Sequence, residues 1–487
     1  MDKYIIWGLG SNGTIAYELL KDYVIVEAFV EQNPNLIGKT YKGIEIISFD
    51  DYLKRKEKLP LIITPARDSS NIIHLLASNN IYNYTILSDL LNFFYYDNAL
   101  SINTDCFVKK EYKIIFESMI NLYKELLTNY FCFSFLNQPI SFNSKNRKID
   151  YNKYNYPITL SQTESITRLH KIIFNGKLQI IKDTQLPKEA DLLVLHGINL
   201  KGQHLAIQAA TRKIPILFAE DGFIRSIVPL SVKNVDLIYN QSHSTILDDK
   251  GIYINAFGTS NIEMILNSDI KLSNEQILRT KNIIKLIKDN KISKYNHQPI
   301  LNLDIGNPKH KKVLVIDQVY NDKSIKLGWA NEKVFKDMLL AAINENPGAD
   351  ILVKTHPDKR DNCIRGYLTD VEPKDNVYKV DFAINPISML EQVDKVYVCT
   401  SQMGFEALMC GKEVHIFGMP FYAGWGVTND RQTNPRRIKK RSLEEIFYAA
   451  YIMCTKYVSY KTNSVCEIEQ TIEEILELRK KYWTEQG

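Results

Sequence analysis

Short apolar runs separated by helix-length amphipathic segments recur along most of this chain, and they constrain its fold more than any other feature. The clearest runs are Tyr4–Gly8, Val24–Val30, Ile214–Ala219, Val313–Asp317 and Val396–Thr400. Short, continuous apolar runs are typical of strands that are buried on both faces of a parallel sheet. Strands of this kind alternating with helices predict an α/β protein made of doubly wound lobes. In such lobes ligands bind at the carboxyl ends of the strands.

Two polar stretches, residues 143–148 and 296–309, interrupt this alternation and indicate connectors between domains. The last 45 residues are expected to be helical. We therefore expect five parts, which are a Rossmann-like N-terminal domain, a helical connector, a first lobe, a second lobe, and C-terminal helices that pack back on the lobes. Their expected bounds are residues 1–100, 101–155, 156–300, 301–435 and 436–487.

Composition narrows the class of protein. Hydrophobic residues make up 45% of the chain and charged residues 24%, which is ordinary for a globular protein and excludes a largely disordered one. The first residues run directly into a strand, and no stretch approaches the ~18 apolar residues of a membrane span, so we expect a cytoplasmic protein. Seven cysteines without a C-x-x-C pair predict reduced thiols. The net charge of +5 is spread along the chain, so no nucleic-acid partner is expected. No D-x-D motif or Cys, His and acid cluster indicates a metal site.

A glycine motif follows the first strand. Gly8, Gly10 and Gly13 fit the pattern G-x-G-x-x-G at a strand-to-helix turn, and Glu31 lies near the end of the next strand. This arrangement is typical of nucleotide sites, in which glycines let backbone N–H groups approach a phosphate and the acid binds a ribose. The same pattern also occurs in a Rossmann-like domain that binds nothing or serves in assembly, and both interpretations stay open.

A second candidate site lies at the end of the run Ile214–Ala219. Glu220 and Asp221 follow this run directly, and Arg225 comes soon after. A carboxylate at the end of a buried strand faces the ligand edge of a doubly wound lobe. There it can act as a base, as an electrostatic stabiliser or as a nucleophile that forms a glycosyl-enzyme adduct. The alternative is a helix start in which Asp221 is the N-cap.

Three polar strand ends in the second lobe predict an anion site. Gln318 follows one strand, Lys354 through His356 and Pro357 follow the next, and Thr400 and Ser401 begin a helix after a third. Free N–H groups at a helix start favour phosphate, and a histidine fixed by proline can donate to a phosphate or protonate a leaving group. As alternatives, the hydroxyl residues are plain N-caps and the histidine is an ordinary loop residue.

Two further segments leave alternatives open. The aromatic, glycine-rich loop 418–426 is consistent with a lid, with a sugar platform or with a packed loop. The basic run 436–441 is usually a solvated face, but lipid phosphates of a membrane-bound acceptor are also possible partners.

At these residues the sequence resembles the retaining β-Kdo transferases of bacterial capsule biosynthesis, the KpsC-type capsule polysaccharide proteins. The resemblance covers about residues 175 to 460 and does not reach the N-terminal 150 residues. The matching stretches occur in order along the chain, and they are residues 220–226, 293–296, 313–318, 351–358, 400–408 and 417–426.

The resemblance implies a GT-B fold, CMP-β-Kdo as the donor, no metal or other cofactor, and retention of the β configuration. It implies that Asp221 is the nucleophile that forms a Kdo-enzyme adduct, with support from Glu220, Arg225 and Lys294. It assigns His356 to the departing CMP. The other residues it assigns to the donor site are Gln318, Lys354, Pro357, Thr400, Ser401, Gln402 and Glu406.

The leading hypothesis is a glycosyltransferase that adds β-Kdo, or a related ulosonic acid, to a capsule or lipopolysaccharide glycan. The acceptor is expected to be lipid-linked, which implies peripheral contact with the cytoplasmic face of the inner membrane. Two alternatives remain. One is an NAD-dependent sugar-modifying enzyme that uses the N-terminal domain, and the other is a non-catalytic capsule assembly protein.

Overall fold

The computed structural model describes residues 3–86 and 153–486 with gaps, which include 10–12, 65–71, 198–201 and 356–365. The chain divides into two compact units. One comprises residues 1–137, 183–188 and 198–214, and the other comprises residues 138–182, 189–197 and 215–487. Mainly parallel sheets with helices make this an α/β protein, as the alternating apolar runs predict. Among the described residues no helix is both long enough and apolar enough to cross a membrane.

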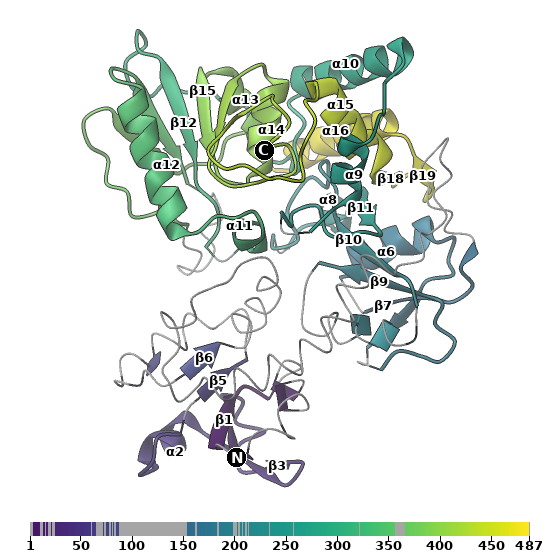
Figure 1. Cartoon of the computed structure of the whole chain (residues 1–487), viewed down its shortest axis with the longest axis vertical. Helices are drawn as coiled ribbons and strands as arrows, with labels where there is room; N and C mark the ends of the chain where they lie inside the picture. Colours follow the sequence, from purple (N-terminus) through teal and green to yellow (C-terminus); the bar gives the residue numbers. More distant parts are fainter. Residues whose placement is uncertain are drawn as a thin grey trace. The chain divides into compact units, whose positions relative to one another are not determined.

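The N-terminal unit contains a six-stranded sheet, drawn in purple and blue in Figure 1. Its order is β3-β4-β2-β1-β5-β6, and all its pairs are parallel except the hairpin of β3 and β4. Buried Trp7 and Tyr52 anchor its core. The elements are β1 (Lys3–Trp7), β2 (Ile25–Val30), β3 (Thr40–Tyr41), β4 (Ile44–Ile47), α2 (Phe49–Lys54), β5 (Leu61–Ile63) and β6 (Tyr84–Ile86).

The second unit contains two sheets, of which the first has seven strands in the order β19-β18-β11-β10-β9-β7-β8. Strands β8, β7, β9 and β10 are parallel, whereas β11, β18 and β19 are antiparallel to their neighbours. Helix α6 (Glu164–Ile173) packs its Leu169 and Ile173 against one face of the sheet. The strands are β7 (Pro157–Leu160), β8 (Gln179–Ile181), β9 (Leu192–His196), β10 (Ile216–Asp221), β11 (Ser244–Asp248), β18 (Thr455–Val458) and β19 (Val465–Cys466).

The expectation that the last 45 residues are helical is wrong in part. Helix α15 (Leu443–Phe447), a π-helical turn (Tyr448–Met453) and α16 (Ile468–Gln486) are helical, but β18 and β19 lie between them. Strand β18 pairs with β11, with Ser244 opposite Tyr457. Strand β18 has only four residues, and its partner β11 is distant in the sequence. The local sequence of β18 therefore gives only a weak strand signal. The C-terminal segment therefore completes the first sheet of its own unit.

The second sheet of this unit has six parallel strands in the order β14-β13-β12-β15-β16-β17. Figure 1 shows α12 on one side of it and α13 and α14 on the other, and two hydrophobic clusters fill these two layers. The strands are β12 (Lys312–Ile316), β13 (Asp350–Lys354), β14 (Val377–Val380), β15 (Lys395–Val398), β16 (Glu413–Ile416) and β17 (Asn429–Asp430). The helices are α11 (Lys323–Leu327), α12 (Glu332–Glu345), α13 (Pro386–Glu391) and α14 (Gln402–Met409).

One hydrophobic cluster joins the two sheets of this unit. It contains Phe223 and Ile246 from the first sheet region, and Leu314 and Val396 from the second. Helices α8 (Leu237–Asn240), α9 (Asn261–Asn267) and α10 (Asn274–Asp289) add to the same cluster. Because the core is continuous, the ligand-facing edges of the two sheets belong to one packed body.

Candidate functional site

Asp221 is the last residue of β10, and a buried arginine lies beside it. The Arg225 Nε atom is 2.9 Å from the Asp221 Oδ1 atom. The Arg225 side chain is 1% exposed and that of Asp221 is 18% exposed, so the carboxylate retains a path to solvent. No helix begins at Asp221, and the alternative that it serves as an N-cap is therefore wrong.

The local backbone explains why this loop has its shape. The N–H groups of Arg225 and Ser226 both donate to the carbonyl of Lys294, at 3.1 and 3.2 Å. The Gly222 N–H donates to the Ser244 carbonyl, and a β-carbon at position 222 would overlap the Ser244 side chain. Glycine is therefore required at this position, and the two strands and the Lys294 segment together fix the direction of the Arg225 side chain.

Three neighbouring side chains decide the charge of Asp221. Burial raises the pKa of a carboxyl group, but Arg225, Lys294 and His196 act in the opposite direction, and the net result is that the pKa of Asp221 is lowered. In return, the pKa of Lys294 is raised by Tyr295 and Asp221 against the opposing effect of burial. Asp221 is therefore an ionised carboxylate at neutral pH, which is the form that can attack an electrophilic carbon.

Glu220 has a different environment from its neighbour. Its Oε1 atom accepts a hydrogen bond from the backbone N–H of Asp221 at 3.0 Å. Its charge acts on Lys294 and on the buried phenol of Tyr253. This position allows Glu220 to hold Lys294 protonated beside Asp221.

The carboxyl edge of the second sheet is polar and largely self-satisfied. Gln318 and Thr400 bond to each other, with Nε2 to Oγ1 at 3.0 Å and the Thr400 N–H to Oε1 at 3.0 Å. Ser401 is the N-cap of α14 and accepts from the Met403 N–H. The N-cap alternative for Ser401 is therefore correct, and the start of a helix also favours an anion through its dipole.

Lys354 is 6% exposed and points into the protein. Its Nζ atom donates to the Thr355 carbonyl at 2.7 Å and to the Val380 carbonyl at 3.4 Å. His356 and Pro357 lie outside the described residues, so their predicted contacts with a donor stay predictions.

Two side chains of α14 connect this edge to the first sheet. Gln402 donates from Nε2 to the carbonyl of Phe223 at 2.9 Å. Glu406 is 2% exposed and accepts from the Ser293 hydroxyl at 2.7 Å and from Gln402 at 3.1 Å. Burial raises the pKa of Glu406 to about 7, although these hydrogen bonds and Lys294 lower it. The two residues thus tie α14 to the segments that flank Asp221.

The loop 418–426 is packed and is not a lid. Tyr422 and Trp425 are fully buried, and the Tyr422 hydroxyl donates to the Ser401 carbonyl at 2.5 Å. The rings of Phe421 and Phe223 are 5.0 Å apart between centroids. The aromatic residues of this loop therefore pack against the segments that follow Asp221 and precede α14.

The arginines of the basic run 436–441 are engaged within the protein, whereas Lys440 is exposed. Arg436 and Arg437 pair with Glu263 of α9, at 2.7 and 3.2 Å. Arg441 donates to backbone carbonyls and pairs with Glu445 at 2.8 Å. These contacts hold the segment that leads back to the first sheet against α9.

In the N-terminal unit, the acid of the glycine motif is already bonded to the backbone. Glu31 accepts from the N–H groups of Leu9 and Gln32, both at 2.8 Å, so it braces the turn itself. A β-carbon on Gly13 would overlap the Gly8 carbonyl, which requires glycine at that contact. Gly10 lies outside the described residues. The nucleotide hypothesis for this unit stays a prediction.

Two histidines near Asp221 were missed by the sequence-based prediction. His196 ends β9, and the ring of His170 from α6 lies 5.6 Å from it between centroids. The signal available in the sequence was a histidine at the end of an apolar strand, the same feature that drew attention to Asp221 and Thr400.

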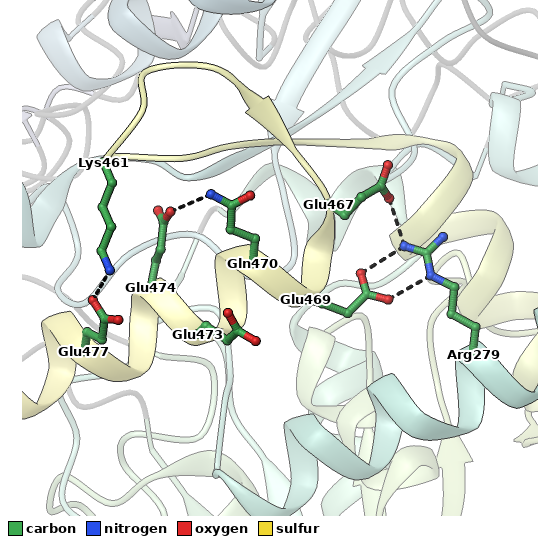
Figure 2. Close-up of a pocket in the computed structure, with 8 residues that line it drawn as sticks. All are labelled: Arg279, Lys461, Glu467, Glu469, Gln470, Glu473, Glu474 and Glu477. Carbon is green, nitrogen blue, oxygen red and sulfur yellow. Dashed lines mark hydrogen bonds and ion pairs between the residues drawn. The ribbon is translucent and has the colours of Figure 1, made fainter.

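An open cavity lies elsewhere, at the start of α16 (Figure 2). It has a volume of about 640 Å³. Arg279 pairs there with Glu467 and Glu469 at 2.8 Å, and Lys461 pairs with Glu477. Because five carboxylates line this cavity, it repels an anionic sugar nucleotide. The residues that line it are Arg279, Lys461, Glu467, Glu469, Gln470, Glu473, Glu474 and Glu477.

Comparisons with known proteins identify the family of this chain. The capsule polysaccharide biosynthesis protein family matches residues 192–306 and 304–463. The capsule polysaccharide modification protein LipA of Neisseria meningitidis serogroup B is 34% identical over 360 residues, which cover 72% of this chain and 49% of LipA. The lipopolysaccharide-processing protein LpsZ of Rhizobium meliloti is 35% identical over 272 residues, which cover 54% of this chain and 59% of LpsZ. This chain thus spans about half the length of the curated relatives.

A solved structure provides the same result in three dimensions. Thermosulfurimonas dismutans KpsC, a beta Kdo 2,4 transferase, is 33% identical and superposes with a TM-score of 0.61. The match covers 66% of this chain and 98% of that one. The resemblance seen in the motifs is confirmed, and this chain belongs to the capsule polysaccharide biosynthesis protein family of KpsC type.

Proposed function

We propose that this protein is a retaining glycosyltransferase that moves Kdo, or a related ulosonic acid, from CMP-β-Kdo to a capsule or lipopolysaccharide glycan. The observation that carries the proposal is the position of the Asp221 carboxylate at the end of β10, 2.9 Å from the Nε atom of Arg225. The similarity to the KpsC transferase of Thermosulfurimonas dismutans supports the choice of sugar.

The chemistry is a double displacement. An Asp221 oxygen attacks the anomeric carbon, and the bond from that carbon to the phosphate oxygen breaks with its electron pair going to CMP. An acceptor hydroxyl then attacks the same carbon from the opposite side, and the electron pair of the ester bond returns to Asp221. Two inversions give net retention. Arg225 and Lys294 stabilise the carboxylate before attack and after release, and they also suit the carboxylate of the sugar.

The donor nucleotide is assigned to the edge of the second sheet. We propose that the two sheets of this unit are the lobes of a GT-B fold, with the N-terminal sheet as a separate domain. Gln318, Thr400 and Ser401 are positioned to receive the phosphate and cytidine, and His356 is proposed to assist the departure of CMP. No metal or further cofactor is required in this scheme, because the positive end of the α14 helix dipole would oppose the phosphate charge.

The acceptor is proposed to be a lipid-linked glycan at the cytoplasmic face of the inner membrane. Each transferase motif occurs once in this sequence. We therefore propose that the protein forms one type of glycosidic linkage. Because the three arginines of the basic run 436–441 are engaged within the protein, the proposed membrane contact would have to use the exposed Lys440 or another surface.

The test is incubation of the protein with CMP-β-Kdo, followed by mass measurement of the intact protein and peptide mapping. We expect CMP release and a mass increase of one Kdo residue on Asp221. The Asp221→Asn variant should show neither, whereas Asp337→Asn, on the exposed surface of α12, should behave as the wild type. If the wild-type protein releases no CMP and gains no mass, the catalytic proposal fails and a non-catalytic assembly role is favoured.

A further inference from the structure

We propose that His196 is the catalytic base that takes the proton of the acceptor hydroxyl in the second displacement. The inference rests on the proposed function and adds a residue to it. The sequence motifs do not include this histidine, and its role follows from its position beside Asp221.

Strand register places His196 on the same side of the first sheet as Asp221. In the parallel pair of β9 and β10, His196 is opposite Ala219, so the two side chains share a face. Asp221 is two residues beyond Ala219 and therefore shares that face too. At strand spacings of about 4.8 Å across and 3.3 Å per residue along, the two Cα atoms are about 8 Å apart, within reach of both side chains. Any positive charge on His196 lowers the pKa of Asp221, so the two groups are electrostatically coupled.

One ring nitrogen of His196 has no partner. Among the described residues its buried Nδ1 atom has no hydrogen bond, and Nε2 is not one of the buried, unpaired atoms. The ring of His170 from α6 lies beside it, is completely buried, and has no hydrogen bond at either ring nitrogen within the described part of the chain. A buried polar atom without a partner costs about 1–3 kcal/mol, so this pair of rings near Asp221 indicates function more than stability.

The breakdown of the adduct creates a negative charge on Asp221 beside His196, and this charge favours transfer of the proton to His196. While Asp221 is esterified by the sugar, it carries no charge. When the ester bond breaks, the carboxylate is regenerated beside His196 as the proton arrives, so the two new charges attract each other. His170 does not oppose this, because burial and the neighbouring His196 lower its pKa to about 3 and keep it neutral.

The proton and electrons balance in this step. The acceptor oxygen bonds to the anomeric carbon, the bond from that carbon to the Asp221 oxygen breaks, and its electron pair stays on Asp221. The acceptor proton moves to Nε2 of His196 and leaves to solvent after the product departs. General-base assistance of this kind contributes about 10²–10⁴-fold to a rate.

The test separates the two displacements. The protein is loaded with CMP-β-Kdo, free donor is removed, and the decay of the Asp221 adduct is followed by intact mass, first with water and then with a synthetic β-Kdo glycoside as acceptor. In His196→Gln we expect normal adduct formation and decay about 100-fold slower than in the wild type. Added imidazole should restore part of the decay rate in the variant and leave the wild type unchanged. His310→Gln, at the amino edge of the second sheet, should decay as the wild type does.

Three outcomes would overturn the inference. Decay in His196→Gln within about threefold of the wild type would remove the base role. A folded His196→Gln that forms no adduct would place the histidine in the first displacement. Absence of any adduct in the wild type would remove the proposed function itself, and this inference with it.

Discussion

The carboxyl edges of the two sheets in the second unit face different physical demands. At the first edge, Asp221 and Arg225 are largely buried and pair with each other, and nitrogens of the nearby rings of His170 and His196 have no hydrogen-bond partner among the described residues. At the second edge, Gln318 and Thr400 satisfy each other and Lys354 donates to carbonyls. Unpaired buried groups cost stability, whereas paired neutral groups contribute to it. This contrast fits the proposed division of roles, in which the first edge carries the reaction and the second binds the donor.

The largest expected effect tests the reactive character of the first edge. Asp221→Asn keeps the shape of the side chain but removes the charge and the nucleophile. We expect transfer to fall by at least about 10⁴-fold, measured as product formed from CMP-β-Kdo. The exposed variant Asp337→Asn is the matched control. A loss of less than tenfold in Asp221→Asn would remove the distinction between the edges.

A pair of lysine variants compares the two edges directly. Lys294→Met removes a charge that lowers the pKa of Asp221, so we expect kcat/KM to fall about 100-fold. Lys354→Met removes hydrogen bonds to buried carbonyls, so we expect a loss of about 1–3 kcal/mol of unfolding free energy with kcat within threefold. Steady-state kinetics and urea unfolding measure both variants. The opposite pattern would reverse the assignment of the two edges.

The buried hydrogen bond between Glu406 of α14 and Ser293 gives a prediction about the pH dependence of stability. The pKa of Glu406 is raised from 4.5 to about 7, mainly by burial. Between these values the folded chain holds a proton that the unfolded chain has released, so this residue makes stability fall as pH rises. Glu406→Gln should remove up to about 1.4 kcal/mol per pH unit of that slope. Urea unfolding at several pH values in this window measures it.

Glu332→Gln, an exposed substitution on α12, serves as the control for this measurement. Parallel stability curves for the wild type and Glu406→Gln across the window would show that Glu406 titrates normally. The contact between α14 and Ser293 would then be charged.

The smallest expected effect lies at the second edge. Thr400→Val keeps the side-chain shape and removes the hydroxyl that Gln318 bonds at 3.0 Å. We expect a loss of about 1 kcal/mol of unfolding free energy and a donor KM raised by about tenfold, with kcat unchanged. The comparison variant is Thr462→Val, whose hydroxyl bonds only to exposed Ser464 among the described residues. A fall in kcat without a change in KM would give Thr400 a part in the chemistry.

Strand ends were predictable from sequence because they depend on local pattern. Asp221 and Thr400 each end or follow a continuous apolar run, and the structure places both at carboxyl edges. The role of Asp221 came from the family resemblance, and it stays a proposal. Periodicity alone identified the strand and could not choose among a base, a stabiliser and a nucleophile.

Other features depend on contacts between distant segments and could not be read locally. From the sequence alone, the basic run 436–441 is a candidate lipid site. In the structure its Arg436 and Arg437 pair with Glu263 of α9. Lys354 looked available because its own strand does not reveal the carbonyl of Val380. His170 meets His196 only because α6 packs on that face. Each case requires the tertiary fold, since the partner lies on another element.

The insertion of β18 beside β11 has a consequence for how this protein is made. The sheet that carries Asp221 cannot be finished until the ribosome has delivered the entire second sheet and the returning segment. Until then β11 exposes an unpaired edge to other nascent chains, which is a hazard for aggregation. Division of this protein between its two sheets would therefore give two incomplete halves, and the unit is best transferred whole.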